Sequence, residues 1–138
     1  MLVVADTNVI VSGFLWNGNE RRLLDAARDG IIELFTSPTL LEELEDVLSR
    51  PKFTDRLASS SVNVRFLVDG FAELANVVET NPLNAQISRD EDDDALLACA
   101  VAASCEFIVT GDDDLLVLNE YNGIRIMKTA EFLAEINL

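Results

Sequence analysis

The chain has 138 residues, 49% of them hydrophobic, and a formal net charge of −15. This length is enough for one domain with a substantial core, and the hydrophobic content argues against a disordered chain. Histidine is absent, which excludes a catalytic triad or proton relay built on that residue. No apolar run is long enough to span a membrane, and the N-terminus lacks the features of a signal peptide, so we expect a cytoplasmic protein.

The negative charge is unevenly distributed. Residues 1–69 hold 11 acids and 7 bases, whereas residues 70–138 hold 14 acids and 3 bases. Such a charge repels phosphates and argues against tight non-specific binding of nucleic acid. It still allows nucleic-acid chemistry at a site where a metal ion supplies the positive charge, and it suits a partner with a basic segment.

Strand and helix patterns alternate along the chain. The continuously apolar run at residues 2–5 predicts a buried strand of a parallel sheet, and further strands are predicted at residues 31–36, 76–80, 107–110 and 124–127. Apolar stripes at helical spacing predict helices at residues 21–29, 38–49, 61–76, 93–104 and 129–136. Ser37 and Thr129 are the expected N-caps, and Gly30 is the expected helix stop. Residues 14–18 are expected in a loop and residues 81–82 in a turn.

This alternation predicts an α/β fold with a parallel sheet covered by helices on both faces. A single domain is expected over residues 1–138, since the chain shows no linker, repeat or low-complexity segment. Ligands of such sheets bind beyond the carboxyl ends of the strands, where Asp6 and Asp112 are expected. Cys99 and Cys105 are expected to be buried reduced thiols.

Four carboxylates lie where a solvated surface acid is not expected, namely Asp6, Glu43, Asp93 and Asp112. Two of them end apolar runs, and the other two adjoin the apolar sides of expected helices. Acids that converge from distant positions need a cation to offset their repulsion. Carboxylate oxygens are the ligands that Mg²⁺ and Mn²⁺ prefer, so the pattern predicts a site for one or two such ions.

Each of these acids also has a simpler explanation. Asp6 could belong to a turn or cap a helix, Glu43 could pair with an arginine, and Asp112 could lie in a surface hairpin turn. The acids of residues 90–94 could simply favour a helix N-terminus. Within that run Asp93 is preferred, because its spacing from two following leucines places it on the core-facing side. The next candidates in the run are Asp94 and Asp90.

In their order and spacing, the acidic motifs resemble the PIN-domain nucleases over essentially the whole chain. The motifs are Val4-Ala5-Asp6-Thr7-Asn8, Glu43-Leu44, the acids of residues 90–94, and Thr110-Gly111-Asp112-Asp113-Asp114-Leu115. The segment over residues 37–50 is similar to the bacterial and archaeal toxin branch of the family. The better-known relatives of that branch are the VapC-like toxins of toxin–antitoxin systems.

The resemblance implies a Rossmann-like three-layer α/β/α sandwich and a Mg²⁺- or Mn²⁺-dependent endoribonuclease, the toxin of a toxin–antitoxin pair. The family's metal-binding and catalytic acids fall on Asp6, Glu43, Asp93 and Asp112, with Asp114 as an additional metal ligand. The expected supporting residues are Thr7, Asn8, Asp94 and Thr110. Implied partners are single-stranded or structured RNA, a basic antitoxin and a second copy of the chain.

Substrate contacts have to come from few basic residues. Candidates for binding the RNA backbone are Arg21, Arg22, Arg50 and Lys52, although an ordinary solvated surface explains them equally well. Trp16 could stack on a base, pack in the core or form a dimer contact. The site entrance is more acidic than in relatives, because Asp113 stands where a lysine is common.

Three other functions compete with the nuclease. A haloacid-dehalogenase-like phosphotransferase wants a second Asp two residues after the first, where this chain has Asn8. A response-regulator receiver would explain Thr110 and Lys128 at the ends of late strands, but it needs a phosphoacceptor Asp after the third strand, where the chain offers Glu79. A non-catalytic module whose acidic face binds a basic protein would explain the net charge.

Overall fold

The computed structural model describes residues 1–60, 62–81 and 91–138. Within these residues a six-stranded sheet has the order β3-β2-β1-β4-β6-β5. The strands are β1 (Leu2–Ala5), β2 (Glu33–Thr36), β3 (Asn76–Val77), β4 (Phe107–Val109), β5 (Glu120–Tyr121) and β6 (Ile124–Met127). Every neighbouring pair is parallel except the β5–β6 hairpin. The first strand therefore lies inside the sheet, between β2 and β4.

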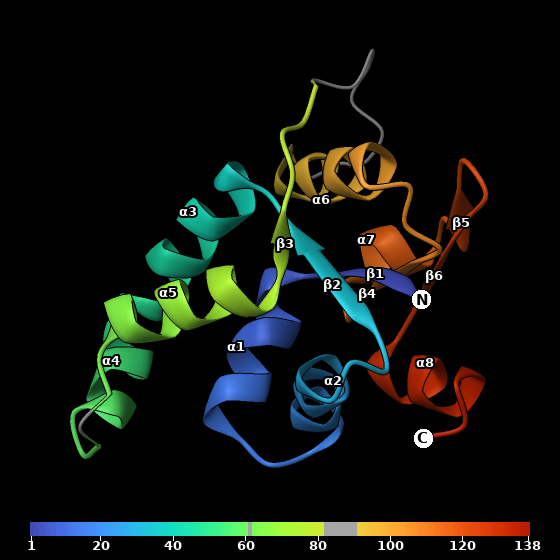
Figure 1. Ribbon diagram of the computed structural model, residues 1–138. Coiled ribbons are helices and arrows are strands. Elements are labelled where there is room, and N and C mark those ends of the chain that lie inside the picture. The colour runs from blue at the N-terminus through green and yellow to red at the C-terminus, as the bar shows by residue number, and fades with distance from the viewer. Residues whose placement is uncertain (61, 82–90) are drawn as a thin grey trace.

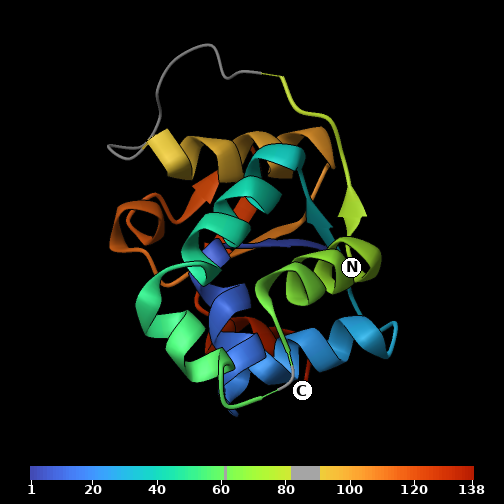
Figure 2. The ribbon, with the colours of Figure 1, turned by 90° about the vertical axis from the view of Figure 1, so that its left-hand side faces the viewer.

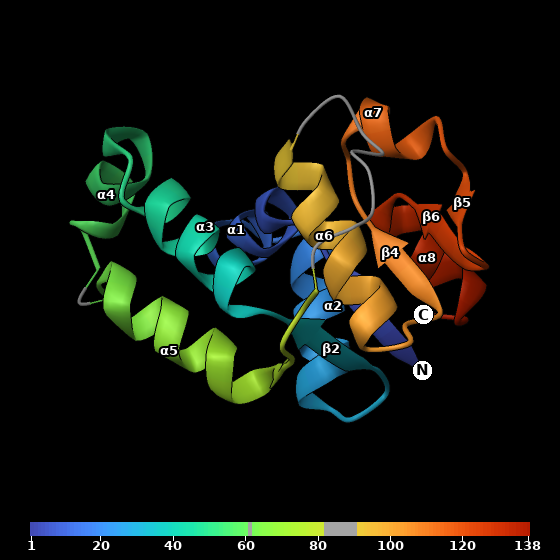
Figure 3. The same cartoon turned by 90° about the horizontal axis from the view of Figure 1, so that it is seen from above.

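Helices cover both faces of this sheet, as the alternation of the sequence predicts. They are α1 (Thr7–Leu15), α2 (Asn19–Arg28), α3 (Pro38–Leu48), α4 (Pro51–Leu57), α5 (Val64–Leu74), α6 (Glu91–Ala102), α7 (Asp113–Leu116) and α8 (Thr129–Glu135). Figure 1 shows α6 and α7 on one side of the sheet and α1, α2 and α8 on the other. Helices α3, α4 and α5 extend beside α1, as Figures 2 and 3 show from two further directions. The architecture is the predicted three-layer α/β/α sandwich.

The central strands fill a hydrophobic core on each side of the sheet because successive side chains of a strand point to opposite faces. Val3 and Val109 are fully buried against α1, α2, α3 and α8, whereas Val4 and Ile108 are fully buried against α6 and α7. Burial on both faces explains why these strands are continuously apolar in sequence. None of the helices in the described residues combines the length and apolarity needed to cross a membrane.

Helix α1 replaces part of the loop that the sequence predicts at residues 14–18. It ends at Leu15, so Phe14 and Leu15 are helical, and only Trp16 to Gly18 connect it to α2. Its run of β-branched residues disfavours a helix locally, but the helix buries residues on nearly all sides. Gly13 permits the close approach of α2, because a Cβ there would come within 2.6 Å of Leu24 Cδ1.

Other boundaries also differ from the prediction. Helix α3 ends at Leu48, close to the predicted end at residue 49, but Pro51 then occupies the first turn of α4, a helix that was not predicted and whose Phe53 and Leu57 are buried. Lys128, not Thr129, holds the N-cap position of α8, and Thr129 is its first helical residue. Strand β3 ends at residue 77 instead of 80. Residue 82 of the expected turn lies outside the described residues, as does residue 61, where a helix start was expected.

Several local predictions are confirmed. Ser37 caps α3 by accepting a hydrogen bond from the Leu40 amide, and Gly30 follows α2 with a φ of +77°. Cys99 and Cys105 are free and buried, and burial raises the pKa of both thiols to about 12. They are therefore inert core residues.

Candidate metal centre

Asp6 lies directly after the central strand, at the N-cap position of α1. Its side chain does not cap that helix. Instead, its Oδ2 accepts a hydrogen bond of 2.7 Å from the hydroxyl of Thr110. Thr110 follows β4, the strand that lies next to β1. The Asp6 carboxylate is thus held at the carboxyl edge of the sheet, where parallel α/β proteins bind their ligands.

Asp112 reaches the same edge from the connection between β4 and α7. Its backbone amide donates to the Thr110 hydroxyl oxygen at 3.0 Å, and its Oδ1 accepts from the Asp114 amide at 2.9 Å. Asp112 is thus the N-cap of α7 and does not lie in a hairpin turn. The buried Thr110 side chain connects Asp6 with the Asp112 backbone. Gly111, between Thr110 and Asp112, has no positive φ, so the backbone conformation there does not require glycine.

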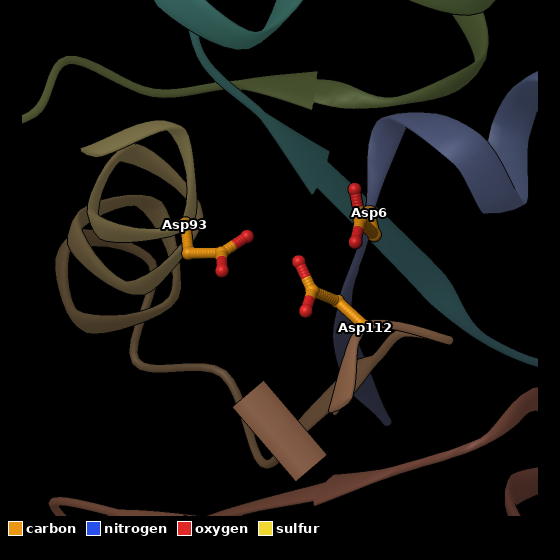
Figure 4. Close-up of side chains that lie close together, drawn as sticks. All are labelled: Asp6, Asp93 and Asp112. Carbon is orange, nitrogen blue, oxygen red and sulfur yellow. The ribbon is translucent and has the colours of Figure 1, made fainter. Parts of the chain in front are cut away.

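Asp93 of α6 completes a group of three carboxylates. It lies in the first turns of α6 and is only 5% exposed. Asp6, Asp93 and Asp112 each offer an oxygen, and these oxygens all lie within 4.8 Å of one another. Figure 4 shows the three side chains pointing toward a common space from α6, the end of β1 and the start of α7.

Burial makes negative charge costly at this group. Desolvation is the main cause that raises the pKa of Asp6, and the nearby Asp112 carboxylate raises it further. Hydrogen bonds from Thr110 and from the backbone amides of Asn8 and Thr7 oppose that rise in pKa. In the part of the chain that the structure describes, neither Asp6 nor Asp112 forms a salt bridge with a lysine or arginine.

This donor set fits a hard divalent cation. Three carboxylates within 4.8 Å supply oxygen ligands of the kind that Mg²⁺ and Mn²⁺ take, and no thiol or imidazole shares the site. A cation there would offset repulsion between anions that are largely removed from water. Asp6, Asp93 and Asp112 are therefore the residues that could hold the ion.

The remaining acids of the prediction do not join that group of three. Glu43 is half-buried on α3, and Asp114 is half-buried in α7, but their oxygens do not share the mutual distance of 4.8 Å. Asp94 is half-buried on α6. Asp90 lies outside the described residues. The metal-binding and supporting roles of these acids stay predictions.

The basic residues predicted to bind substrate are mostly engaged within the protein. Arg21 donates to the carbonyl oxygens of Gly13 and Phe14, at the C-terminal end of α1. Arg22 donates to Asn19 within α2, and Arg50 pairs with Asp46 at 3.6 Å. The Lys52 ammonium lies 4.8 Å from the centre of the Phe53 ring. Arg21 thus has a structural role whatever else it contacts.

Trp16 is 45% exposed and takes part in a small cation–aromatic cluster. The Arg56 guanidinium lies 4.7 Å from the centre of its ring and donates two hydrogen bonds to the Leu15 carbonyl. The Phe53 ring meets Trp16 edge to face at 6.3 Å. These contacts attach α4 to the end of α1, so packing explains much of Trp16, and its exposed part stays available.

Beside the carboxylates lies a cavity with a mixed polar and apolar lining that the sequence did not predict. Its lining includes Asn8 and Ser12 of α1, Asn19 and Glu20 of α2, and Thr110 and Lys128 after two adjacent strands. The signal in the sequence was the position of Lys128, directly after the last long strand. Strand β6 pairs with β4 in parallel, so residues after both strands meet at one edge.

A protein-family model described as a PIN domain matches residues 2–114. The chain belongs to the PIN-domain family. The predicted resemblance is therefore confirmed at the level of the family. A solved structure with the same PIN fold is VapBC2 from Rickettsia felis bound to a DNA fragment from their promoter. It is 14% identical in sequence, with a TM-score of 0.58, and the match covers 91% of this chain and 97% of that one. No curated protein matches the sequence.

The match to the PIN-domain model includes all three clustered carboxylates. Asp6, Asp93 and Asp112 lie within residues 2–114, whereas Lys128, which connects β6 to α8, and Thr129, the first residue of α8, lie beyond them. The acid group thus belongs to the part of the chain that matches the family, and one wall of the neighbouring cavity does not.

Proposed function

We propose that this PIN domain is a Mg²⁺- or Mn²⁺-dependent endoribonuclease. The observation that carries the proposal is the group of three carboxylates within 4.8 Å, from three separate elements, at the carboxyl edge of the sheet. PIN domains are generally nucleases, and membership of the family supports the same reaction class. The absence of histidine excludes a histidine general base.

The residues of the site have distinct roles in this proposal. Asp6, Asp93 and Asp112 bind the cation through their oxygens, and the Thr110 hydroxyl fixes the orientation of Asp6. A bound divalent ion neutralises phosphate charge, lowers the pKa of a water and stabilises the leaving oxygen. Glu43 is proposed to orient the attacking water or to bind a second ion. Asp114 is proposed as an additional ligand.

Membership of the family also suggests a biological role. We propose that the protein acts in the cytoplasm as the toxin of a toxin–antitoxin pair, inhibited by a basic antitoxin. The similar fold of the Rickettsia felis VapBC2 structure and the net charge of −15 support this idea. The antitoxin would contribute the positive charge that the acid-rich chain lacks. Self-association is a further prediction.

The test is cleavage of labelled RNA panels, single-stranded and structured, in Mn²⁺, Mg²⁺ or EDTA. We expect wild type to cleave only with metal and Asp6→Asn to lose more than about a hundredfold in rate, since residues that merely support a metal ligand already contribute 10–100-fold. The matched control is Asp46→Asn, which removes the same charge from an exposed site on α3.

Two outcomes would contradict the proposal. Equal cleavage by wild type and Asp6→Asn would place the activity elsewhere or in a contaminant. Failure of every RNA to be cleaved, together with unchanged binding of a basic protein partner by Asp6→Asn and Asp112→Asn, would favour the non-catalytic acidic module.

A further inference from the structure

The cavity beside the carboxylates, lined by polar and apolar side chains, has the size of a ligand site. Its volume is about 320 Å³, within the range of sites that hold small organic molecules. It lies on the face of the sheet that carries α1, α2 and α8, whereas Asp93 approaches the acid group from α6 on the other face. A chain that crosses the carboxyl edge of the sheet could therefore occupy both places.

Thr110 connects the cavity with the acid group. Its side chain lines the cavity, donates to Asp6 Oδ2 at 2.7 Å and accepts from the Asp112 amide. Gly111, which follows Thr110, and Asn8, which is close to Asp6 in the sequence, also line the cavity. A ligand in the cavity thus lies one side chain away from the carboxylates.

The cavity lining carries both signs of charge. Lys128 is one of only two lysines in the chain, and it stands among the three bases of the acid-rich second half. In the described part of the chain, Lys128 forms no salt bridge. Glu20, also on the wall, is an acceptor, and the amides of Asn8 and Asn19 supply donors and acceptors. A simple anion would not use such a mixed lining, but a nucleotide would.

We propose that the cavity binds the nucleotide next to the scissile phosphate of RNA, with Lys128 on its outer phosphate. Glu20 accepts a hydrogen bond from a ribose hydroxyl, the group that distinguishes RNA from DNA. The apolar wall formed by Val9 and Ala130 packs against the base or sugar. This inference deepens the proposed function and rests on it for the position of the scissile phosphate.

Lys128 is suitable for substitution without damage to the fold. Its side chain is exposed, and although it holds the N-cap position of α8, it makes no side-chain capping hydrogen bond. Lys128→Met therefore removes the charge and keeps most of the aliphatic length. Ala130→Met offers an independent variant, since it narrows the cavity from an exposed helical position without changing charge. The matched control is Arg65→Met, an exposed cation on α5 that pairs only with surface acids.

Binding is tested without cleavage by titrating adenosine 5′-monophosphate into the protein and following backbone amide signals by NMR. We expect shifts at Asn8, Ser12, Gly111 and Thr129, and about tenfold weaker binding by Lys128→Met, as loss of one charged contact of about 1.4 kcal/mol implies. Ala130→Met should weaken binding too, and Arg65→Met should not. Shifts confined to other parts of the protein, or equal affinity in Lys128→Met, would overturn the proposal.

Kinetics with RNA separate the cavity from the metal centre. For Lys128→Met we expect KM to rise about tenfold with kcat nearly unchanged, because a contact made equally in ground and transition states affects KM alone. The slope of log KM against log salt should become shallower by about 0.7, the value for one phosphate contact on a single strand. Unchanged KM and slope would overturn the proposed role of the cavity and would leave the proposed nuclease activity intact. If the wild-type protein binds the nucleotide but cleaves no RNA, the result would support nucleotide binding in the cavity and would overturn the proposed reaction.

Discussion

The acids of α3 and the acids at the sheet edge are held in different ways. On α3, Glu45 and Asp46 are exposed and each lies near an arginine. The Glu45–Arg65 pair measures 3.4 Å and the Asp46–Arg50 pair 3.6 Å. Pairs of this kind at the surface contribute about 0–1 kcal/mol to stability and need no other partner.

At the sheet edge, Asp6 and Asp112 form no salt bridge with a lysine or arginine of the described residues. Asp93 is almost completely buried, and Asp6 and Asp112 are half-buried, with all three within 4.8 Å. Hydrogen bonds from Thr110 and from backbone amides oppose the rise in the pKa of Asp6 but do not abolish it. Burial and convergence, not the number of acids, distinguish a site from a solvated surface.

Metal binding should stabilise the protein through the clustered acids. At a Mn²⁺ concentration of about 100 times Kd, linkage predicts about 2.7 kcal/mol and a rise in melting temperature of roughly 8 °C. Asp112→Asn should lose this rise, yet keep its fold, because asparagine also caps a helix such as α7. Differential scanning fluorimetry measures both. An equal rise in Asp112→Asn would place the ion elsewhere.

Thr110→Val should weaken both stability and activity. The variant removes the donor to Asp6 and the acceptor for the Asp112 amide, so we expect a loss of about 1–3 kcal/mol in the free energy of unfolding. The rate of RNA cleavage should fall about 10–100-fold, as is usual for partners of metal ligands. Thr110→Ser keeps the hydroxyl and should retain most of the activity. Full activity in Thr110→Val would contradict the positioning role.

Without metal, Asp6 should make stability depend on pH. Its pKa in the folded protein is raised above 3.8, so the folded state holds the proton more tightly. The resulting penalty is absent below pH 3.8 and is complete above the folded pKa. In EDTA, the free energy of unfolding of the wild-type protein, relative to that of Asp6→Asn, should therefore fall as pH rises from 3.8 to the folded pKa of Asp6. A constant difference between the two proteins would contradict the desolvation of Asp6.

The smallest effect is expected at the exposed ion pairs of Arg65, which lies on α5 and reaches Glu45 of α3. Arg65→Met breaks the pairs with Glu45 and Asp69, both 3.4 Å long and formed by exposed side chains. We expect a change of at most about 1 kcal/mol in the free energy of unfolding, measured by urea denaturation. Metal binding and RNA cleavage should stay the same. A loss of stability as large as that expected for Thr110→Val would mean that the exposed and buried acids differ less in their contribution to stability than their burial suggests.

Much of the fold could be predicted because its signals are local. Ser37 before Pro38 marks the start of α3, and the apolar runs around Val4 and Ile108 mark strands buried on both faces. Helix α1 could not be predicted in this way. Its β-branched residues and Gly13 disfavour a helix, and burial against α2 and α3 overrides that preference.

The sequence analysis expected four acids to converge on one site, and the structure brings three of them together. Sequence placed Asp6, Asp93 and Asp112 beside apolar segments, and only the tertiary structure decides that these three oxygens meet within 4.8 Å while Glu43 and Asp114 do not. Spacing along a helix defines a face, whereas a distance of a few ångström depends on how separate elements pack.

By itself, the sequence determined the α/β architecture, the family and the acid-rich character of the site, because hydrophobic periodicity and residue types are local properties. The tertiary structure alone decided which acids lose water together, and it placed Lys128 beside Thr110. Those two residues are 18 positions apart, and they meet because β4 and β6 pair in parallel, so that the residues after both strands lie at one edge.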